Sequence, residues 1–376
     1  MDDLDETLGL LTPPFNFTAG LVGMGNVGGT IAAMYLAAGI DVIGYDEDQR
    51  TRKDGPETIR GHLSRLERFK LLKGTASEAM GRLTVAGSLD DMESCATVTE
   101  AVFEDRAIKQ EVFGKLSSIV GPNTILATNT SSLDPISFSQ EISHPERYAV
   151  THFLKPADVA LLVEVGPATE NTSPYLVDNL TSFFQSIGKR TVRVNRLPWI
   201  INPLQFSLLD AAMRFYEDEV PAKDIDDVVK DLASYWLDNG LKPLSEELYE
   251  RRFAVDLWRS VKYRAEELET RNVASHKDIE YTLKALAERW KVLGVLGGAD
   301  AGGLPVFKNI YAIFATRGLF LPPVPETLEK LVHLGRIGWK TRAGFFDYSP
   351  EQIENYSDQL VRGMVETRKA FVARKK

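Results

Sequence analysis

The fold is decided by one stretch, Ala19-Gly-Leu-Val-Gly-Met-Gly-Asn-Val-Gly-Gly-Thr-Ile-Ala-Ala-Met-Tyr-Leu-Ala-Ala-Gly-Ile-Asp-Val-Ile-Gly-Tyr-Asp46. A short apolar strand runs into three glycines with the spacing G-x-G-x-x-G, and an Ala-rich helix follows. Gly23 permits a tight turn, Gly25 lets the backbone approach a pyrophosphate, and Gly28 lets the helix pack closely on the sheet. The N–H groups and the positive dipole end of that helix then face the phosphates. The stretch therefore predicts a dinucleotide-binding βαβ unit.

A second predicted strand, residues 41–45, ends in Asp46. An acidic side chain at this place accepts hydrogen bonds from both ribose hydroxyls and repels a 2′-phosphate, which favours NAD over NADP. Residues 19–40 contain no charged residue, which is also a feature of a membrane-spanning helix. Glycine weakens a helix by roughly 1 kcal/mol relative to alanine, however, and the stretch is rich in glycine. We therefore prefer the dinucleotide-binding interpretation.

Length and composition describe a globular chain with room for two domains. The chain has 376 residues, of which 44% are hydrophobic and 26% charged. Its formal net charge of −9 argues against nucleic acid or an anionic membrane surface as the main partner. The single cysteine, Cys95, excludes an internal disulfide framework and suits a reducing compartment. The acidic N-terminus lacks the basic start of a secretory signal, so we expect a cytoplasmic protein.

Strand-like runs alternate with helical patterns over the first part of the chain, which predicts an α/β fold with a mostly parallel sheet. After the first two strands, the expected strands are residues 83–86, 97–103, 125–127, 148–153, 161–165 and 191–194. The expected helices after the first are residues 56–72, 107–120 and 174–187. Beyond residue 195 strand-like runs disappear and helical stripes take over. We therefore predict a Rossmann-type dinucleotide-binding domain over residues 1–195 and an all-helical domain over residues 196–376.

Five histidines are candidates for the acid–base group that a hydride transfer at an alcohol needs. Four lie in hydrophilic settings typical of exposed residues: His62, His144, His276 and His333. His152 differs, because it ends a predicted strand at the carboxyl edge of the sheet. Glu164 lies inside the apolar run 161–165, where a carboxylate is costly to bury unless it is paired. Two interpretations remain open: two structural polar residues, or an acid–base pair on adjacent strands.

These motifs resemble those of the L-3-hydroxyacyl-CoA dehydrogenase family over most of the chain. The family's serine motif corresponds to Asn129-Thr-Ser-Ser-Leu133, and its His-Phe-x-x-Pro element to His152-Phe-Leu-Lys-Pro156. Its Leu-Val-Glu-Val strand corresponds to Leu162–Val165, and the asparagine that follows its last strand to Asn202. Residues 331–348 are similar to its C-terminal signature.

The resemblance implies an NAD-dependent dehydrogenase of a 3-hydroxyacyl-CoA, with no metal and with a homodimeric assembly. His152 would exchange the proton of the 3-hydroxyl, and Glu164 would orient its imidazole. Ser131 and Asn202 would hydrogen-bond the substrate oxygens. The expected cofactor-binding residues are Gly23, Gly25, Gly28, Asp46, Glu104, Lys109 and Asn129. Glu104 and Lys109 are included because residues 100–109 resemble the family's segment beside the nicotinamide.

Two departures from the family pattern leave the substrate open. Lys155 stands where the family usually has asparagine, and residues 215–258 form an additional stretch that is helical by pattern. Both fall near the expected acyl group, so Ser131, Lys155 and Asn202 are the candidate substrate-binding residues. One alternative is a dehydrogenase of a free 3-hydroxy acid, of the gulonate or carnitine type. Another is a non-catalytic NAD-binding protein, since some members of this superfamily are lens proteins.

Overall fold

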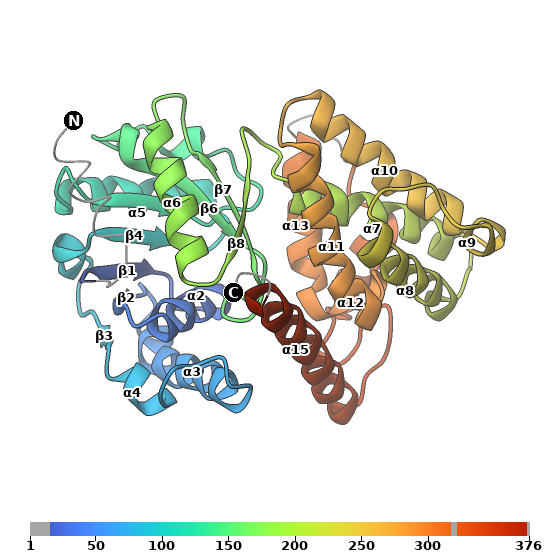
Figure 1. The fold of residues 1–376 in the computed structure, drawn as a ribbon, viewed down its shortest axis with the longest axis horizontal. Coiled ribbons are helices and arrows are strands. Elements are labelled where there is room, and N and C mark those ends of the chain that lie inside the picture. The colour runs from blue at the N-terminus through green and yellow to red at the C-terminus, as the bar shows by residue number, and fades with distance from the viewer. Residues whose placement is uncertain (1–15, 317–321, 374–376) are drawn as a thin grey trace. The chain divides into compact units, whose positions relative to one another are not determined.

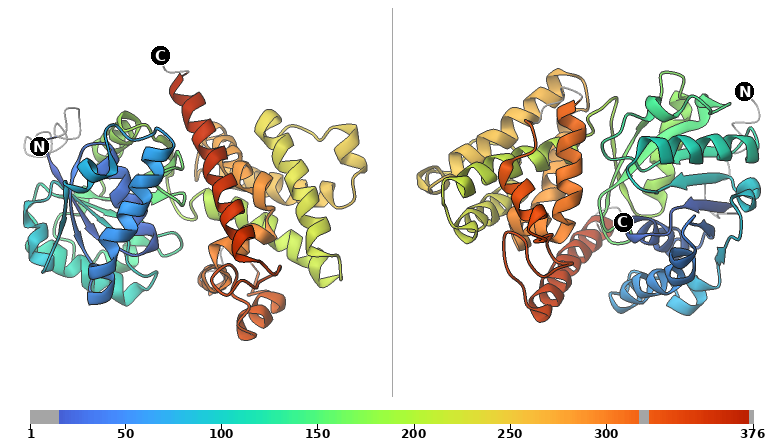
Figure 2. Two further views of the ribbon diagram at one scale, coloured as in Figure 1. Left: turned by 90° about the horizontal axis from the view of Figure 1, so that it is seen from below. Right: turned by 180° about the vertical axis from the view of Figure 1, so that it is seen from behind.

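The computed structural model describes residues 16–316 and 322–373. By its contacts the chain divides into two units, Met1–Arg196 with Thr367–Lys376, and Leu197–Glu366. These units differ from the expected domains at the C-terminus, because the end of the last helix groups with the first unit. Figure 1 colours the chain by residue number, and Figure 2 gives two further views.

The first unit is built on an eight-stranded sheet with the order β3-β2-β1-β4-β5-β6-β7-β8. The strands are β1 (Thr18–Val22), β2 (Asp41–Tyr45), β3 (Leu83–Val85), β4 (Thr97–Glu100), β5 (Ile125–Thr128), β6 (Tyr148–Phe153), β7 (Leu162–Pro167) and β8 (Arg190–Arg193). Neighbouring strands run parallel except β6 and β7, which are antiparallel. The predicted α/β fold with a mostly parallel sheet is confirmed. Because the strand order reverses between β1 and β4, a ligand crevice is expected outside their carboxyl ends.

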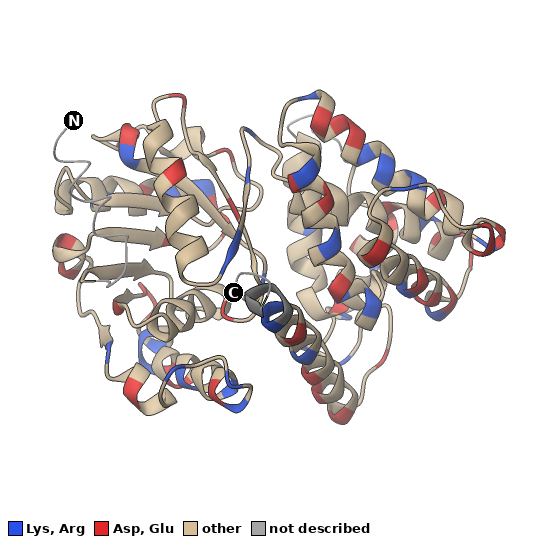
Figure 3. Cartoon of the chain, viewed as in Figure 1, with Lys and Arg blue, Asp and Glu red and all other residues tan. Residues whose placement is uncertain are grey.

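Helices pack around this sheet (Figure 1). In the first unit they are α2 (Asn26–Ala37), α3 (Gln49–Arg68), α4 (Ala76–Met80), α5 (Arg106–Ile119) and α6 (Pro174–Ser186). Strands β4, β5 and β6 are buried along their whole length, as expected of strands covered on both faces. Charged side chains are accordingly sparse on the central strands and frequent on the outer helices (Figure 3).

Residues 18–40 contain β1 and α2, in agreement with the βαβ unit that the sequence predicts. Two sequence predictions need correction. The helix expected from residue 56 begins at Gln49, because Asp48 accepts the N–H of Thr51 and caps its first turn. Pro56 therefore lies inside α3. The strand expected over 97–103 ends at Glu100, and the chain then turns towards Asp105, the cap of α5.

The elements of the second unit are helices. They are α7 (Ile201–Glu217), α8 (Ala222–Asn239), α9 (Glu246–Glu250), α10 (Ala254–Thr270), α11 (His276–Leu293), α12 (Leu296–Gly302), α13 (Leu304–Thr316) and α14 (Glu326–His333), while α15 (Pro350–Ala373) continues into the first unit. The additional stretch 215–258 supplies α8 and α9. Its apolar stripe on α8 is buried from Ile225 to Trp236, and Trp236 stacks near Trp290 of α11 with ring centroids 5.7 Å apart. Within the two described ranges, no helix is long and apolar enough to cross a membrane.

Candidate active site

The turn between β1 and α2 has the geometry of a phosphate-binding loop. Gly23 has a φ of +98°, and a Cβ there would lie 2.5 Å from the carbonyl oxygen of Ala101. A Cβ on Gly28 would lie 1.8 Å from the carbonyl oxygen of Gly23, so no larger residue fits the close approach of α2. At Gly25, in contrast, the Cβ position has nothing within 4 Å. The turn therefore combines two positions that require glycine with one that leaves the backbone open to a ligand.

The start of α2 and the end of β2 complete a site that fits a dinucleotide. Gly25 caps α2 without a side-chain hydrogen bond, so the first N–H groups of the helix can serve an anion. Asp46 is held in place because its Oδ2 accepts the N–H of Met24 at 2.8 Å and its Oδ1 that of Asp48 at 3.0 Å. Each carboxylate oxygen keeps a further lone pair for a ribose hydroxyl.

His152 and Glu164 form a buried pair on neighbouring strands. The antiparallel register of β6 and β7 places the two residues directly opposite each other. The Nδ1 atom of His152 lies 2.5 Å from Oε2 of Glu164, and the two side chains are 8% and 0% exposed. A carboxylate at Nδ1 fixes the tautomer and the orientation of the ring. The arrangement leaves Nε2 as the nitrogen that can exchange a proton with a ligand.

The loop after β5, which carries Ser131, wraps around the carboxylate of Glu104. Oε1 of Glu104 accepts the N–H of Ser131 at 2.8 Å, the N–H of Ser132 at 2.7 Å and the hydroxyl of Thr130 at 2.8 Å. The Ser131 hydroxyl lies 3.3 Å from the same oxygen. Burial raises the pKa of Glu104, but the charge of Lys109 and these hydrogen bonds outweigh burial and lower the pKa to about 2. The loop therefore encloses a charged carboxylate.

Lys109 of α5 lies behind Glu104. Its Nζ is 2.6 Å from Oε1 of Glu100 and 3.3 Å from Oε2 of Glu104. Burial lowers the pKa of Lys109, but the charges of the two glutamates more than offset burial and raise the pKa above its ordinary value. The Lys109 side chain is only 1% exposed. Any influence of Lys109 on a cofactor would therefore act through Glu104 rather than by direct contact.

Asn129 ties the serine loop to the histidine strand. Its Oδ1 accepts the N–H of Phe153, the residue after His152, at 3.0 Å. Its own N–H donates to the carbonyl oxygen of Glu100 at 2.9 Å. Sequence comparison with the family suggested a cofactor contact for Asn129, and that contact stays a prediction. The structure adds a positioning role, because the backbone and the side chain of Asn129 together connect the ends of β4, β5 and β6.

Lys155 and Asn202 are the remaining expected substrate-binding residues. Lys155 is half-buried in the turn after β6, and its charge acts on His62 of α3. Burial lowers the pKa of His62. The positive charges of Arg65 and Lys155 lower this pKa further, whereas the negative charge of Asp158 raises it. Arg65 pairs with the buried Asp158 at 2.6 Å. Asn202 is buried in the first turn of α7 in the second unit.

Glu100 is a site residue that sequence reasoning missed. It ends β4 with 0% exposure and receives Lys109 at 2.6 Å. A usable signal was present in the sequence, because a glutamate in a buried strand requires a cationic or hydrogen-bonding partner. Lys109 lies on the buried face of the following helix together with Phe113 and Leu116. A lysine on that apolar face could have been matched to Glu100.

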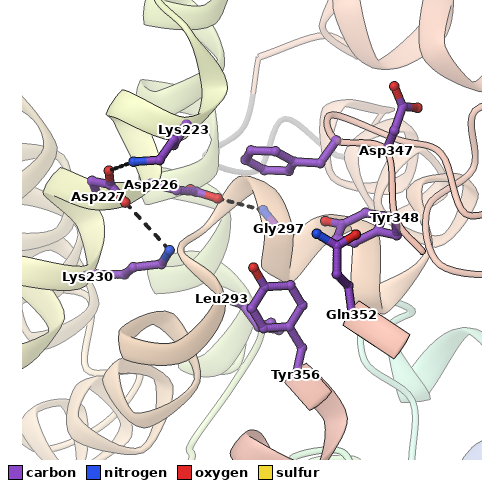
Figure 4. A pocket seen from close by; sticks show the side chains of 11 residues that line it. Lys223, Asp226, Asp227, Lys230, Leu293, Gly297, Asp347, Tyr348, Gln352 and Tyr356 are labelled. Atoms are coloured by element: carbon purple, nitrogen blue, oxygen red, sulfur yellow. Dashed lines mark hydrogen bonds and ion pairs between the residues drawn. The ribbon is translucent and has the colours of Figure 1, made fainter. Parts of the chain in front are cut away.

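A cavity of about 220 Å³ in the second unit is distinct from these residues. It is lined by α8, the start of α12 and residues 346–356, and Figure 4 shows Lys223 and Lys230 on either side of Asp227. Beneath it, Asp226 accepts the N–H groups of three residues at 2.8, 2.9 and 2.8 Å: Val295, Leu296 and Gly297. These contacts cap the start of α12. None of the expected catalytic or cofactor-binding residues lines this cavity.

Comparisons with known proteins identify relatives of this chain. Residues 18–197 match the family model described as 3-hydroxyacyl-CoA dehydrogenase, NAD binding domain. The chain is 32% identical over 221 residues to 3-hydroxyadipyl-CoA dehydrogenase of Escherichia coli (strain K12), which covers 58% of this chain and 46% of that protein. It is 30% identical over 213 residues to a probable 3-hydroxybutyryl-CoA dehydrogenase of Bacillus subtilis (strain 168), which covers 56% of this chain and 74% of that one.

A solved structure extends the similarity to most of the chain. The crystal structure of 3-hydroxybutyryl-CoA dehydrogenase from Escherichia coli K12 superposes with a TM-score of 0.64 at 25% identity, covering 88% of this chain and 59% of that one. The chain thus spans less than half the length of the curated Escherichia coli relative and over half of this solved chain.

The dinucleotide turn and the match to an NAD binding domain together define a class, that of proteins with a Rossmann-type dinucleotide-binding domain. Within that class, the chain belongs to the 3-hydroxyacyl-CoA dehydrogenase family. The resemblance seen in the sequence is confirmed. The matched residues 18–197 coincide with the sheet unit, where the dinucleotide turn and the His152–Glu164 pair lie.

Proposed function

We propose that this protein transfers a hydride between NAD and the 3-hydroxy or 3-oxo group of a 3-hydroxyacyl-CoA. The observation that carries the proposal is the buried pair of His152 and Glu164, 2.5 Å apart at the carboxyl edge of the sheet. NAD, when bound, supplies the hydride acceptor or donor. The backbone at Gly25, the first turn of α2 and the carboxylate of Asp46 would hold it.

His152 is the acid–base group in this proposal. Its Nε2 takes the proton of the 3-hydroxyl during oxidation and returns it during reduction. Glu164 holds the ring through Nδ1 and balances the positive charge while the extra proton is on the ring, as the buried carboxylate of a Ser-His-Asp triad does. Because Glu164 is fully buried, water does not compete for Nδ1 and the ring keeps one orientation.

Ser131 and Asn202 are proposed to hydrogen-bond the reacting oxygens of the substrate. Ser131 is well supported for such a role, because Glu104 holds both its N–H and the neighbouring N–H of Ser132. A hydroxyl on a fixed loop stabilises a developing charge without a cost of reorganisation during the reaction. Asn202 can donate and accept hydrogen bonds through its amide.

Lys155 is proposed to select the acyl group. Its ammonium only donates hydrogen bonds and carries a full charge, whereas the family's asparagine is neutral. Its charge acts on His62 together with that of Arg65, while the carboxylate of Asp158 opposes both. We infer a preference for a substrate with an additional anionic group. The 3-hydroxyadipyl-CoA in the name of the Escherichia coli relative is such a thioester.

The experiment that tests the proposal follows NADH absorbance with a panel of 3-hydroxyacyl-CoA thioesters and the matching free 3-hydroxy acids. Activity with thioesters alone supports the proposal. Activity with free acids alone favours the alternative of a 3-hydroxy acid dehydrogenase. NADH binding without turnover of any substrate would favour a non-catalytic protein, and the His152→Ala variant serves as the baseline for background oxidation.

The assembly and location are further proposals. We propose a homodimer in the cytoplasm, because the resemblance implies a dimer and the single cysteine suits a reducing compartment. Sedimentation equilibrium would give twice the mass of 41.9 kDa for a dimer. A species of 41.9 kDa at micromolar concentration would contradict the dimer, and cell fractionation would test the location.

A further inference from the structure

We propose that the buried cluster of Glu100, Lys109 and Glu104 makes the nucleotide site selective for the oxidised form of NAD over the reduced form. The inference rests on the proposed function, in which NAD binds at this edge of the sheet. Two carboxylates share one ammonium group, with contacts of 2.6 Å and 3.3 Å. The cluster therefore carries a net charge of one negative unit inside the protein.

The contacts of Glu100 show why it is a carboxylate. Oε1 accepts the N–H of Val102 at 2.8 Å and the ammonium of Lys109 at 2.6 Å. Oε2 accepts the hydroxyl of Thr128 at 2.7 Å. A group surrounded by donors fits a carboxylate, which only accepts, better than a protonated acid, which must also donate.

Glu104 is a carboxylate for the same reason. Its oxygens receive three backbone N–H groups, side-chain hydroxyls and the ammonium of Lys109. Tyr148, at the start of β6, is subject to the same negative charges. Burial raises the pKa of Tyr148 well above its ordinary value, and the charges of Glu100, Asp134 and Glu104 act in the same direction.

The topology places this cluster on the nicotinamide side of the site. Asp46 follows β2 and would hold the ribose at the adenosine end, and the reversal of strand order between β1 and β4 would receive the phosphates. The nicotinamide end would then face the ends of β4, β5 and β6, the side that carries His152. Glu100 ends β4, and Glu104 lies in the segment that follows. Glu104 is also the exposed member of the cluster, at 27% against 1% for Lys109.

Charge then distinguishes the two forms of the cofactor. The nicotinamide ring is positively charged when oxidised and neutral when reduced, so a fixed negative charge favours the oxidised form. At roughly 10 Å and an effective dielectric constant near 20, one unit charge changes the ratio of the two affinities by about tenfold. Because Glu100 and Lys109 are buried, salt screens this effect less than it screens surface charges.

The test measures dissociation constants of NAD+ and NADH by titration calorimetry, without substrate. The variant is Glu100→Gln, whose amide can accept from Lys109 and Val102 and donate to Thr128. The matched control is Glu111→Gln on α5, the helix that carries Lys109, where Glu111 is 65% exposed and pairs with Lys115. We expect the ratio Kd(NAD+)/Kd(NADH) to rise about tenfold in Glu100→Gln, to persist in high salt, and to stay unchanged in Glu111→Gln.

The outcomes separate this inference from the proposed function. If the wild type binds neither nucleotide, the proposed function fails. If both nucleotides bind and Glu100→Gln leaves their ratio unchanged, the inference is overturned while the proposed function stands. Should Glu100→Gln fail to fold, Glu104→Gln gives the same test, because its amide oxygen still accepts the N–H groups of Ser131 and Ser132. An unchanged ratio in Glu104→Gln would overturn the inference equally.

Discussion

The sheet unit and the helical unit bury their carboxylates in different ways. Glu104, in the sheet unit, is held by Lys109 and by hydrogen bonds, which outweigh burial and lower its pKa to about 2. Asp226, in the helical unit, is held mainly by three backbone N–H groups of α12. Burial raises the pKa of Asp226 to about 7 in spite of those hydrogen bonds and the charge of Lys230. An adjacent buried cation thus keeps an acid charged where backbone N–H groups do not.

The comparison assigns different tasks to the two units. Asp300 repeats the pattern of Asp226, because it accepts the N–H groups of Phe345 and Phe346 and its burial raises its pKa to about 6. The helical unit therefore uses its buried acids to hold chain segments together. In the sheet unit, the buried Glu100 lies at the end of β4 and pairs with the buried Lys109, beside the proposed cofactor. We infer that substitutions in the sheet unit act on the reaction and those in the helical unit act on stability.

The largest expected effect comes from Glu164→Gln, which removes the charge that orients His152. Positioned acid–base catalysis contributes about 100- to 10,000-fold, so we expect turnover to fall by at least about a hundredfold. Steady-state kinetics gives the turnover, and NADH fluorescence shows whether cofactor binding is retained. The control is Glu146→Gln, since Glu146 forms an exposed pair with His144 at 3.2 Å. An equal loss of activity in both variants would contradict the special role of the buried pair.

Asp46→Ala should have the next largest effect. Hydrogen bonds to a charged group are worth roughly 1.5–3 kcal/mol, so NAD affinity should fall by at least about tenfold and the preference for NAD over NADP should narrow. Titrations with both nucleotides measure the change. Asp41→Ala, at the exposed start of the same strand, should leave both affinities unchanged. A wild-type enzyme that already prefers NADP would refute the assignment of Asp46.

Lys155→Asn tests the choice of substrate within the sheet unit. The variant restores the residue that the family usually has, so activity should shift towards ordinary 3-hydroxyacyl-CoA thioesters by a few-fold, the scale of about 1 kcal/mol for a partly exposed charge. The ratio kcat/KM for thioesters with and without a second carboxylate measures the shift. Lys115→Asn, on the surface of α5, is the control. Identical substrate profiles in the wild type and Lys155→Asn would contradict a role for Lys155 in substrate selection.

The smallest effect on the reaction is expected from Asp226→Asn, which tests the helical side of the comparison. Because burial raises the pKa of Asp226 from its ordinary 3.8 to about 7, the folded state holds the proton more tightly than the unfolded state. Its contribution to stability is complete below pH 3.8 and is lost as the pH rises through about 7. The wild-type free energy of unfolding should therefore fall between pH 5 and pH 8 relative to the variant, by on the order of 1 kcal/mol. Denaturant unfolding at both pH values checks this, and parallel curves would contradict it.

Local spacing made part of the site predictable. The three glycines, Asp46 and the alternation of strands and helices are features of contiguous sequence, so the doubly wound fold and the dinucleotide turn could be predicted from it. His152 and Glu164 could be paired because twelve residues separate a strand end from the middle of the next strand, and an antiparallel turn brings them opposite each other.

Contacts between segments that are distant in the sequence were harder to predict. Arg65, for example, pairs with Asp158, 93 residues away. The Glu100–Lys109–Glu104 cluster and the enclosure of Glu104 by the serine loop depend on how β4, α5 and the loop after β5 meet. The hydrogen bond from the N–H of Phe153 to the Asn129 side chain also joins two segments that are distant in the sequence. No periodicity in the sequence encodes such partners.

The central claim is that the sheet unit carries the reaction through His152. A single-turnover measurement tests it most directly, because enzyme saturated with NADH and mixed with acetoacetyl-CoA reports the hydride step without product release. We expect His152→Ala to slow that step by about 100- to 10,000-fold while NADH binding stays close to that of the wild type. A single-turnover rate in His152→Ala close to that of the wild type would contradict the account.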